Sequence, residues 1–152
     1  MSATKIDGLI AALESIATPR CLEAARELQD SDTNAESFDL HLRRAGLQAA
    51  HAVVLADAIR QLATGPGPQL RSFSASYNRG LTDSGAVALA EAFPATMSEL
   101  GLVGCVLGDP AGIAILNWVK RAVRPGMVCV EDNRFSGEVR GQLEDPGLRR
   151  RP

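Results

Sequence analysis

The sequence predicts one α/β domain, a short right-handed solenoid of about four strand–helix (βα) units behind an N-terminal helical cap. The apolar pattern of residues 70–93 recurs downstream when position 78 is aligned with positions 105 and 133, at spacings of 27 and 28 residues, and upstream at position 45, a spacing of 33. Each copy combines alternating apolar residues with a turn and a stretch of helical spacing. Only 4% of the residues are aromatic, which suits thin repeated layers. One such unit cannot bury its apolar face alone, so neighbouring units are expected to stack.

Residues 1–34 are expected to form the helical cap. Apolar residues recur at helical spacing within residues 4–16. Thr18 and Pro19 then supply an N-cap and a first-turn proline for a second helix. The first apolar run is too short and too interrupted to predict a membrane span or a secretory signal.

The strands are expected to lie parallel, with one set of side chains facing the helices. This inward set follows the period of two in each unit: Leu40, Leu42, Phe73, Ala75, Leu100, Leu102, Val128 and Val130. Asn78 and Asn133 follow the strands, where a buried amide can bond the backbone of adjacent units. Cys105 is the small apolar alternative at that position, Ala45 takes it in the first unit, and residues 65–68 form an extra loop.

The order LxxLxLxxNxL followed by a helix, with a period of 27 to 28 residues, resembles the leucine-rich repeat of the ribonuclease-inhibitor-like class. The resemblance covers residues 35–146 and is strongest from Leu70 to Phe135. Phe73 and Ala75 replace leucines of the motif, and Ala45 replaces its asparagine. The resemblance implies a curved parallel sheet and a role as an interaction scaffold, inhibitor or regulator.

Local signals place the helices of the units. The first is expected over residues 49–63, burying Val54, Leu55, Ala58, Ile59 and Leu62. The next two begin at residues 82–83 and 109–110, where an aspartate can cap free N–H groups and a proline needs none. Ser136 is expected to cap a last helix that carries Val139 and Leu143, and residues 147–152 to form a disordered basic tail.

Net charge argues against nucleic acid as a partner. The chain has 16 Lys and Arg against 18 Asp and Glu. Setting aside the three arginines of the tail leaves 13 basic residues, a net charge of −5 for the body. Binding to nucleic acid requires a basic face.

The outward strand residues predict a concave face that is charged at one end and small in the middle. Small residues at Ser74 and Gly101 leave room for an inserted partner side chain, and the alternative is that this face is polar for solubility alone. The predicted partner-binding residues are Asp39, His41, Arg43, Ser72, Ser74, Ser76, Glu99, Gly101, Val103, Met127, Cys129 and Glu131.

A catalytic reading competes with the binding reading. Asp39 and His41 share one face of a strand, and Ser74 on the next strand could lie beside the imidazole. A hydrolase would also need an oxyanion hole and a walled pocket, which a smooth parallel face does not supply. The three cysteines have no CxxC spacing and make no metal pattern, and no cofactor motif is present.

We therefore expect a non-catalytic module that binds a protein partner through its concave face or rim, without membrane or cofactor. The alternatives are the Asp39/His41/Ser74 hydrolase and an assembly subunit that forms a homodimer through its last repeat. An exposed edge strand there would invite pairing with a second chain. The odd number of cysteines and the lack of a signal sequence predict the cytoplasm.

Overall fold

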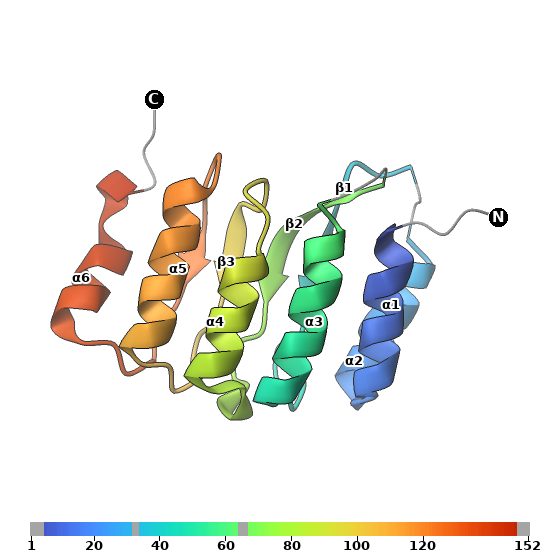
Figure 1. Cartoon of the computed structure of the whole chain (residues 1–152), viewed down its shortest axis with the longest axis horizontal. Helices are drawn as coiled ribbons and strands as arrows, with labels where there is room; N and C mark the ends of the chain where they lie inside the picture. Colours follow the sequence, from blue (N-terminus) through green and yellow to red (C-terminus); the bar gives the residue numbers. More distant parts are fainter. Residues whose placement is uncertain (1–4, 32–33, 64–66, 149–152) are drawn as a thin grey trace.

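The computed structural model describes residues 5–31, 34–63 and 67–148, and these form an α/β fold in which strands and helices alternate (Figure 1). The chain begins with α1 (Lys5–Ile16) and α2 (Pro19–Gln29). Four strands follow: β1 (Ser37–His41), β2 (Gln69–Ser74), β3 (Glu99–Gly101) and β4 (Val128–Cys129). After them in turn come α3 (Ala49–Gln61), α4 (Thr82–Ala92), α5 (Asp109–Arg121) and α6 (Gly137–Glu144), with short 3-10 turns η1 (Arg79–Leu81) and η2 (Pro146–Leu148).

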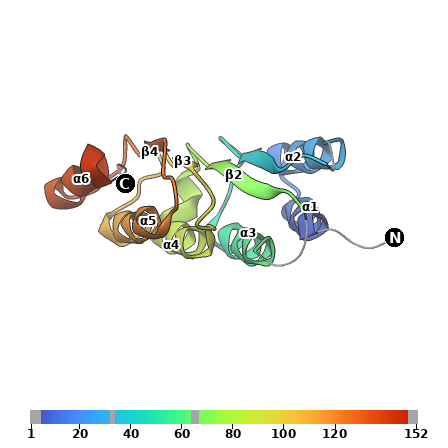
Figure 2. The same ribbon diagram turned by 90° about the horizontal axis from the view of Figure 1, so that it is seen from above.

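The strands form one parallel sheet in the order β1-β2-β3-β4, so neighbours in sequence are neighbours in space. Leu40 pairs with Phe73, Phe73 with Leu100, and Leu100 with Val128, which is the register that the sequence alignment predicts. The helices α3 to α5 stand in one row beside the sheet, and Figure 2 shows α1 continuing that row while α2 lies with the strands. The two N-terminal helices thus occupy the places of one more helix and one more strand.

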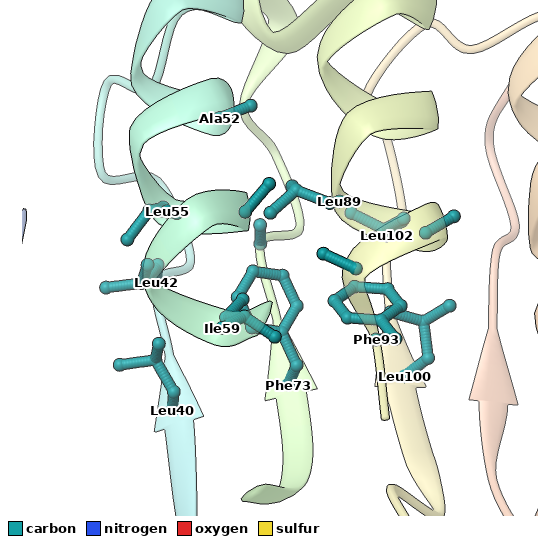
Figure 3. Packing of buried hydrophobic residues seen from close by; sticks show 14 of the residues in the cluster. Leu40, Leu42, Ala52, Leu55, Ile59, Phe73, Leu89, Phe93, Leu100 and Leu102 are labelled. Atoms are coloured by element: carbon teal, nitrogen blue, oxygen red, sulfur yellow. The ribbon is translucent and has the colours of Figure 1, made fainter. Parts of the chain in front are cut away.

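The core lies between the strands and the helix row. Leu40, Leu42, Phe73, Leu100 and Leu102 are at most 2% exposed, and Figure 3 shows them pointing from the strands toward the helices. Burying a leucine or phenylalanine side chain contributes about 1.5–3 kcal/mol relative to leaving it in water. This burial holds each unit against the next.

Aromatic side chains join three adjacent units. The rings of Phe73 and Phe93 have centroids 5.1 Å apart, and those of Phe93 and Trp118 are 5.9 Å apart with an edge-to-face arrangement. Such tilted pairs contribute beyond their buried area. The indole N–H of Trp118 also donates to the Pro94 carbonyl at 3.1 Å, so the loop after α4 is anchored to α5.

Two asparagines tie the strands' ends together as predicted. The Asn78 amide nitrogen donates to the carbonyls of Leu42 and Ala75, and its oxygen accepts from the Leu47 N–H. Asn133 repeats the pattern two units later, bonding the backbone of Leu102, Cys105, Leu107, Val130 and Glu131. Between them, the Cys105 thiol donates weakly to the Ala75 carbonyl. The buried turns thereby keep their polar backbone groups satisfied.

Helix caps differ from expectation in one respect. Thr18 and Ser136 cap α2 and α6 with their hydroxyls, as predicted. The N-cap of α5, however, is Gly108, and the Asp109 carboxylate instead accepts the N–H of Ser136 in the next unit at 2.8 Å. Asp83 does the same for Gly108, also at 2.8 Å. These aspartates therefore cross-link successive units rather than cap their own helices.

Some expectations require correction, and others fall outside the described residues. Val54 is 40% exposed, because it lies at the edge of the inward stripe that Ala52, Leu55 and Ile59 define on α3. Parts of the predicted loop, cap connector and basic tail (residues 1–4, 32–33, 64–66 and 149–152) lie outside the described residues. Across the described ranges, no helix combines the length and the apolar character needed to cross a membrane.

Candidate functional site

One face of the sheet carries the candidate site. The helix row covers the other face, whereas Figure 2 shows no helix of the described chain lying over this one. We call it the open face. All-parallel sheets are usually covered on both faces, because βα crossovers place helices there. The open face is therefore the surface that the fold leaves available for contact.

An arginine bridges three strands at the centre of the open face. The Arg71 guanidinium is 2.6 Å from the Asp39 carboxylate on β1 and 3.5 Å from the Glu99 carboxylate on β3. All three side chains are between one third and one half exposed. Partly exposed pairs of this kind contribute little to stability, typically about 0.2–1 kcal/mol each. Their main effect is to hold a charged row in one arrangement across the sheet.

Sequence reasoning missed Arg71 because strict alternation places it on the inward side with Phe73 and Ala75. The structure shows a register shift between Phe38 and Asp39, where Leu70 and then Ser72 are the partners. The extra residue, Arg71, is thereby turned outward while Leu70 stays fully buried. The detectable signal was an arginine at an inward position next to a leucine at an outward one, a reversal that indicates a bulge.

The histidine and serines are placed differently from the predicted catalytic cluster. The Asp39 carboxylate bonds Arg71, and the His41 Nε2 atom is 3.4 Å from the Ser72 hydroxyl. Ser74 is only the backbone register partner of His41. The structure thus brings an imidazole to a different serine, with the expected aspartate engaged elsewhere.

Ser72 and Ser76 are buried, against the expectation that they line an exposed face. They are 5% and 7% exposed, because neighbouring parallel strands close over short side chains. The Ser76 hydroxyl accepts the Val103 N–H at 3.0 Å, so it serves the backbone of the next unit. The predicted residues Ser74, Gly101, Val103 and Cys129 are half-buried; Asp39, His41, Arg43, Met127 and Glu131 are exposed, and Glu99 is intermediate.

The middle of the open face is a tight floor. A Cβ atom added at Gly101 would lie 3.0 Å from the Ser74 hydroxyl oxygen and 3.3 Å from its Cβ. The missing side chain therefore gives Ser74 its room, and a larger residue at Gly101 would have to move that serine. The predicted trough for a partner side chain is correspondingly shallow.

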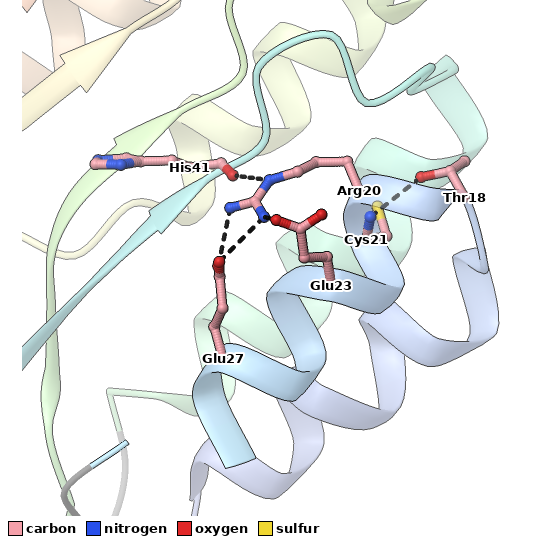
Figure 4. A network of polar contacts seen from close by, with 6 residues as sticks. All are labelled: Thr18, Arg20, Cys21, Glu23, Glu27 and His41. Carbon is pink, nitrogen blue, oxygen red and sulfur yellow. Dashed lines mark hydrogen bonds and ion pairs between the residues drawn. The ribbon is translucent and has the colours of Figure 1, made fainter. Parts of the chain in front are cut away.

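At the N-terminal end, the cap is joined to β1 by Arg20 (Figure 4). Its Nε donates to the His41 carbonyl at 2.9 Å, and its other nitrogens bond Glu23 and Glu27. The hydrogen bond from Arg20 holds the pKa of the Glu27 carboxyl below its ordinary value. The network positions α2 against the end of β1, and hence against the histidine of the open face.

A second surface lies in the turns that follow the strands. Arg44, Tyr77, Gly104 and Asp132 occupy equivalent positions in the four units, and all have positive φ, between 52° and 66°. We call these four residues the turn row. Arg43, Ser76, Val103 and Glu131 are the residues that directly precede it. Sequence reasoning placed Arg43, Val103 and Glu131 at the site and missed Arg44, Tyr77 and Asp132, although a glycine at one of four equivalent positions is a signal of left-handed backbone.

The turn row contains an aromatic ring held between its neighbours. The guanidinium carbons of Arg43 and Arg44 lie 4.8 and 4.9 Å from the Tyr77 ring centroid, within the range of cation–π attraction. On the side of the next unit, a Cβ at Gly104 would be 2.7 Å from two carbon atoms of that ring. The absence of a side chain at Gly104 is what lets the ring lie there.

The cysteines are chemically unequal. Cys21 and Cys105 are fully buried, and burial raises the pKa of both thiols, while Cys129 is half-buried on β4. Within the described ranges, no cluster of three or more His, Cys, Asp or Glu side chains is arranged to hold a metal ion.

A groove of about 520 Å³ lies beside β4 and α6, with apolar residues at its base and acidic residues along it. It is lined by Val128, Val130, Glu131, Asp132, Asn133, Phe135, Arg140, Leu143 and Glu144.

Comparison with models of known protein families gives no match, and comparison with curated proteins gives none either. The functional argument therefore depends on the geometry of the open face and the turn row.

Proposed function

We propose that the chain is a non-catalytic module of the leucine-rich-repeat type, a short solenoid that binds a protein partner in the cytoplasm. The observation that supports binding most is the all-parallel sheet with helices on one face alone. A face of this kind is otherwise covered in α/β proteins. In this proposal the partner, rather than a second helix layer, covers it when the protein is engaged.

The solenoid reading has its own support. Four units stack in sequence order, and inter-unit bonds recur in the same places, made by Asn78 and Asn133 at the turns and by Asp83 and Asp109 at the helix starts. Repetition of the same bond in successive units is what a repeat architecture requires, since each unit contacts mainly its neighbours.

The charges of the open face suit a polar partner surface. The Asp39–Arg71–Glu99 row crosses three strands and stays accessible, and the half-buried Ser74 and Gly101 lie beside it. A contact centred there would combine a small flat floor with fixed charges. Such fixed charges set orientation and specificity more than raw affinity.

Affinity capture from the native cell extract tests the proposal, comparing the unaltered protein with Ser74→Arg and with Arg71→Glu. Ser74→Arg fills the floor, and Arg71→Glu places three carboxylates together. We expect both variants to lose captured proteins while keeping their circular dichroism. Gln142→Arg, on the exposed surface of α6, is the matched control and should capture the same set.

Unchanged capture by both folded open-face variants would refute binding through this face and direct attention to the turn row or the helices. Turnover of a hydrolase substrate that disappears in His41→Ala would refute the non-catalytic part of the proposal. The two outcomes are independent, because capture needs no chemistry and turnover needs no retained partner.

A further inference from the structure

Two guanidiniums beside Tyr77 have no carboxylate partner within the structure's described ranges. Arg43 and Arg44 are exposed and form none of the ion pairs found within 4.0 Å, which instead involve Arg20, Arg60 and Arg71. Both are held near one ring by cation–π contacts. Two like charges kept close together favour an anion that can lie between them. Their position is fixed before any partner arrives.

Tyr77 adds an apolar anchor to this charged pair. Its side chain is 37% exposed even though the ring is packed beside the arginines and over Gly104. Tyrosine and arginine are the residue types enriched where a few side chains carry most of the binding energy of an interface. A preorganised aromatic side chain also loses little entropy on binding.

The opposite end of the same row has the opposite charge. Glu131 and Asp132 occupy in the fourth unit the positions that Arg43 and Arg44 occupy in the first. Both acidic side chains are exposed, and neither forms an ion pair within 4.0 Å in the part of the chain that the structure describes. The row therefore runs from two cations, past a tyrosine and a glycine, to two anions.

The spacing between these ends fits a short extended segment. Three strand-to-strand steps of about 4.8 Å give about 14 Å, and an extended chain covers that length in about four residues. Small or half-buried residues, Val103 and Gly104, lie between the ends and offer no obstacle to a backbone crossing the strands.

We propose that the turn row binds an extended protein segment that carries a carboxylate cluster at one end and a basic residue about four positions away. The carboxylates lie on Arg43 and Arg44 beside Tyr77, and the basic residue lies on Glu131 and Asp132. This inference deepens the proposed function, on which it rests, by naming the chemistry of the partner and the side of the molecule that holds it. The charge order fixes which end of the segment meets which unit.

Selection from a library of random peptides on the immobilised protein tests the inference. We expect the enriched peptides to share an acidic residue and a basic residue about four positions apart. A synthetic copy of the most enriched peptide is then titrated by fluorescence anisotropy. Its affinity should fall by roughly fivefold in the Arg43→Gln/Arg44→Asn variant and by a similar factor in Glu131→Gln/Asp132→Asn. Asparagine is chosen at positions 44 and 132 because it tolerates positive φ.

The matched control is Arg124→Gln, an exposed arginine in the connection between α5 and β4, away from the row. It should leave the affinity unchanged, and added salt should weaken binding to the unaltered protein. Enriched peptides without acidic residues, or an affinity that both row variants retain, would overturn the inference and leave the proposed function standing. Enrichment of no peptide at all would also overturn it, and the capture experiment on the open face then decides the proposed function separately.

Discussion

Replacing Asn78 with alanine should be among the most destabilising single changes in this protein. The residue is 2% exposed, and its amide oxygen is 3.0 Å from the Leu47 N–H, while its nitrogen is 2.9 Å from the Leu42 carbonyl and 2.8 Å from that of Ala75. Alanine leaves the Leu47 N–H without this acceptor and removes a donor from two carbonyls. At about 1–3 kcal/mol for each buried group left unsatisfied, with Ala75 still served by Cys105, we expect a loss of about 3–5 kcal/mol.

Asn78→Asp separates the hydrogen-bond argument from simple loss of volume. The aspartate keeps an acceptor for Leu47 but turns the donor to Leu42 and Ala75 into an oxygen that faces carbonyl oxygens. Burial beside those carbonyls raises the pKa of such a carboxyl, so the folded state holds a proton that the unfolded chain releases. Stability of this variant should therefore fall as the pH rises above about 4, the ordinary pKa of an aspartate.

Urea unfolding, followed by the emission of Trp118 and by circular dichroism, measures both variants. Trp118 is the single tryptophan and is fully buried, so its emission reports the packing of α5. Asn117→Ala, an exposed asparagine on the same helix, is the control and should change stability by less than about 0.5 kcal/mol. A loss below about 1 kcal/mol for Asn78→Ala would refute the claim that its amide bonds hold the first two units together.

The remaining predictions concern the register, the cap, the thiols and the assembly. Leu102→Ala should cost about 2–5 kcal/mol and Ser74→Ala less than about 0.5 kcal/mol in the same unfolding assay, and the reverse order would mean that the inward and outward sets are exchanged. Arg20→Met should cost about 1 kcal/mol at neutral pH, mostly through the lost bond to the β1 backbone, because the Glu27 side chain is 56% exposed and its ion pair is screened. The lowered pKa of Glu27 makes the ion-pair share present above its unfolded value and lost as the pH falls through the folded one, so a difference that grows in acid would contradict the pairing. Iodoacetamide should label Cys129 first, since burial raises the pKa of the other two thiols, and equal labelling rates in the folded protein would count against this burial. Sedimentation should detect dimers at high concentration, formed through the C-terminal edge at the groove beside β4 and α6, and a single monomeric species at every concentration would rule this assembly out.

Much of this fold could be predicted from spacing, because the inward residues recur with the period of the units. The alignment of Leu40, Phe73, Leu100 and Val128 gave the strand register before any coordinates. The asparagine at the turn was also predictable, since a buried turn needs a side chain that both donates and accepts. What repeats in the sequence repeats in space, and that part of the structure follows from the pattern.

The candidate site was harder to predict because it depends on departures from the repeat. Arg71 reaches the open face through a bulge that shifts one strand by a residue, and a period of two has no place for that residue. The turn row depends on backbone with positive φ, which Gly104 signals in one unit while Arg44, Tyr77 and Asp132 adopt it with ordinary side chains.

These departures do not occur at random positions in the chain. Each lies on the side of the sheet or at the turns, where no neighbouring unit packs, and none lies among the inward residues that the helices cover. The stacking of units requires equivalent residues inside but imposes no such requirement outside. The outer positions are therefore free to differ from unit to unit, which allows two arginines in the first turn and two acidic residues in the last. A repeated fold thereby presents a row of side chains with a direction, and a partner can distinguish its two ends.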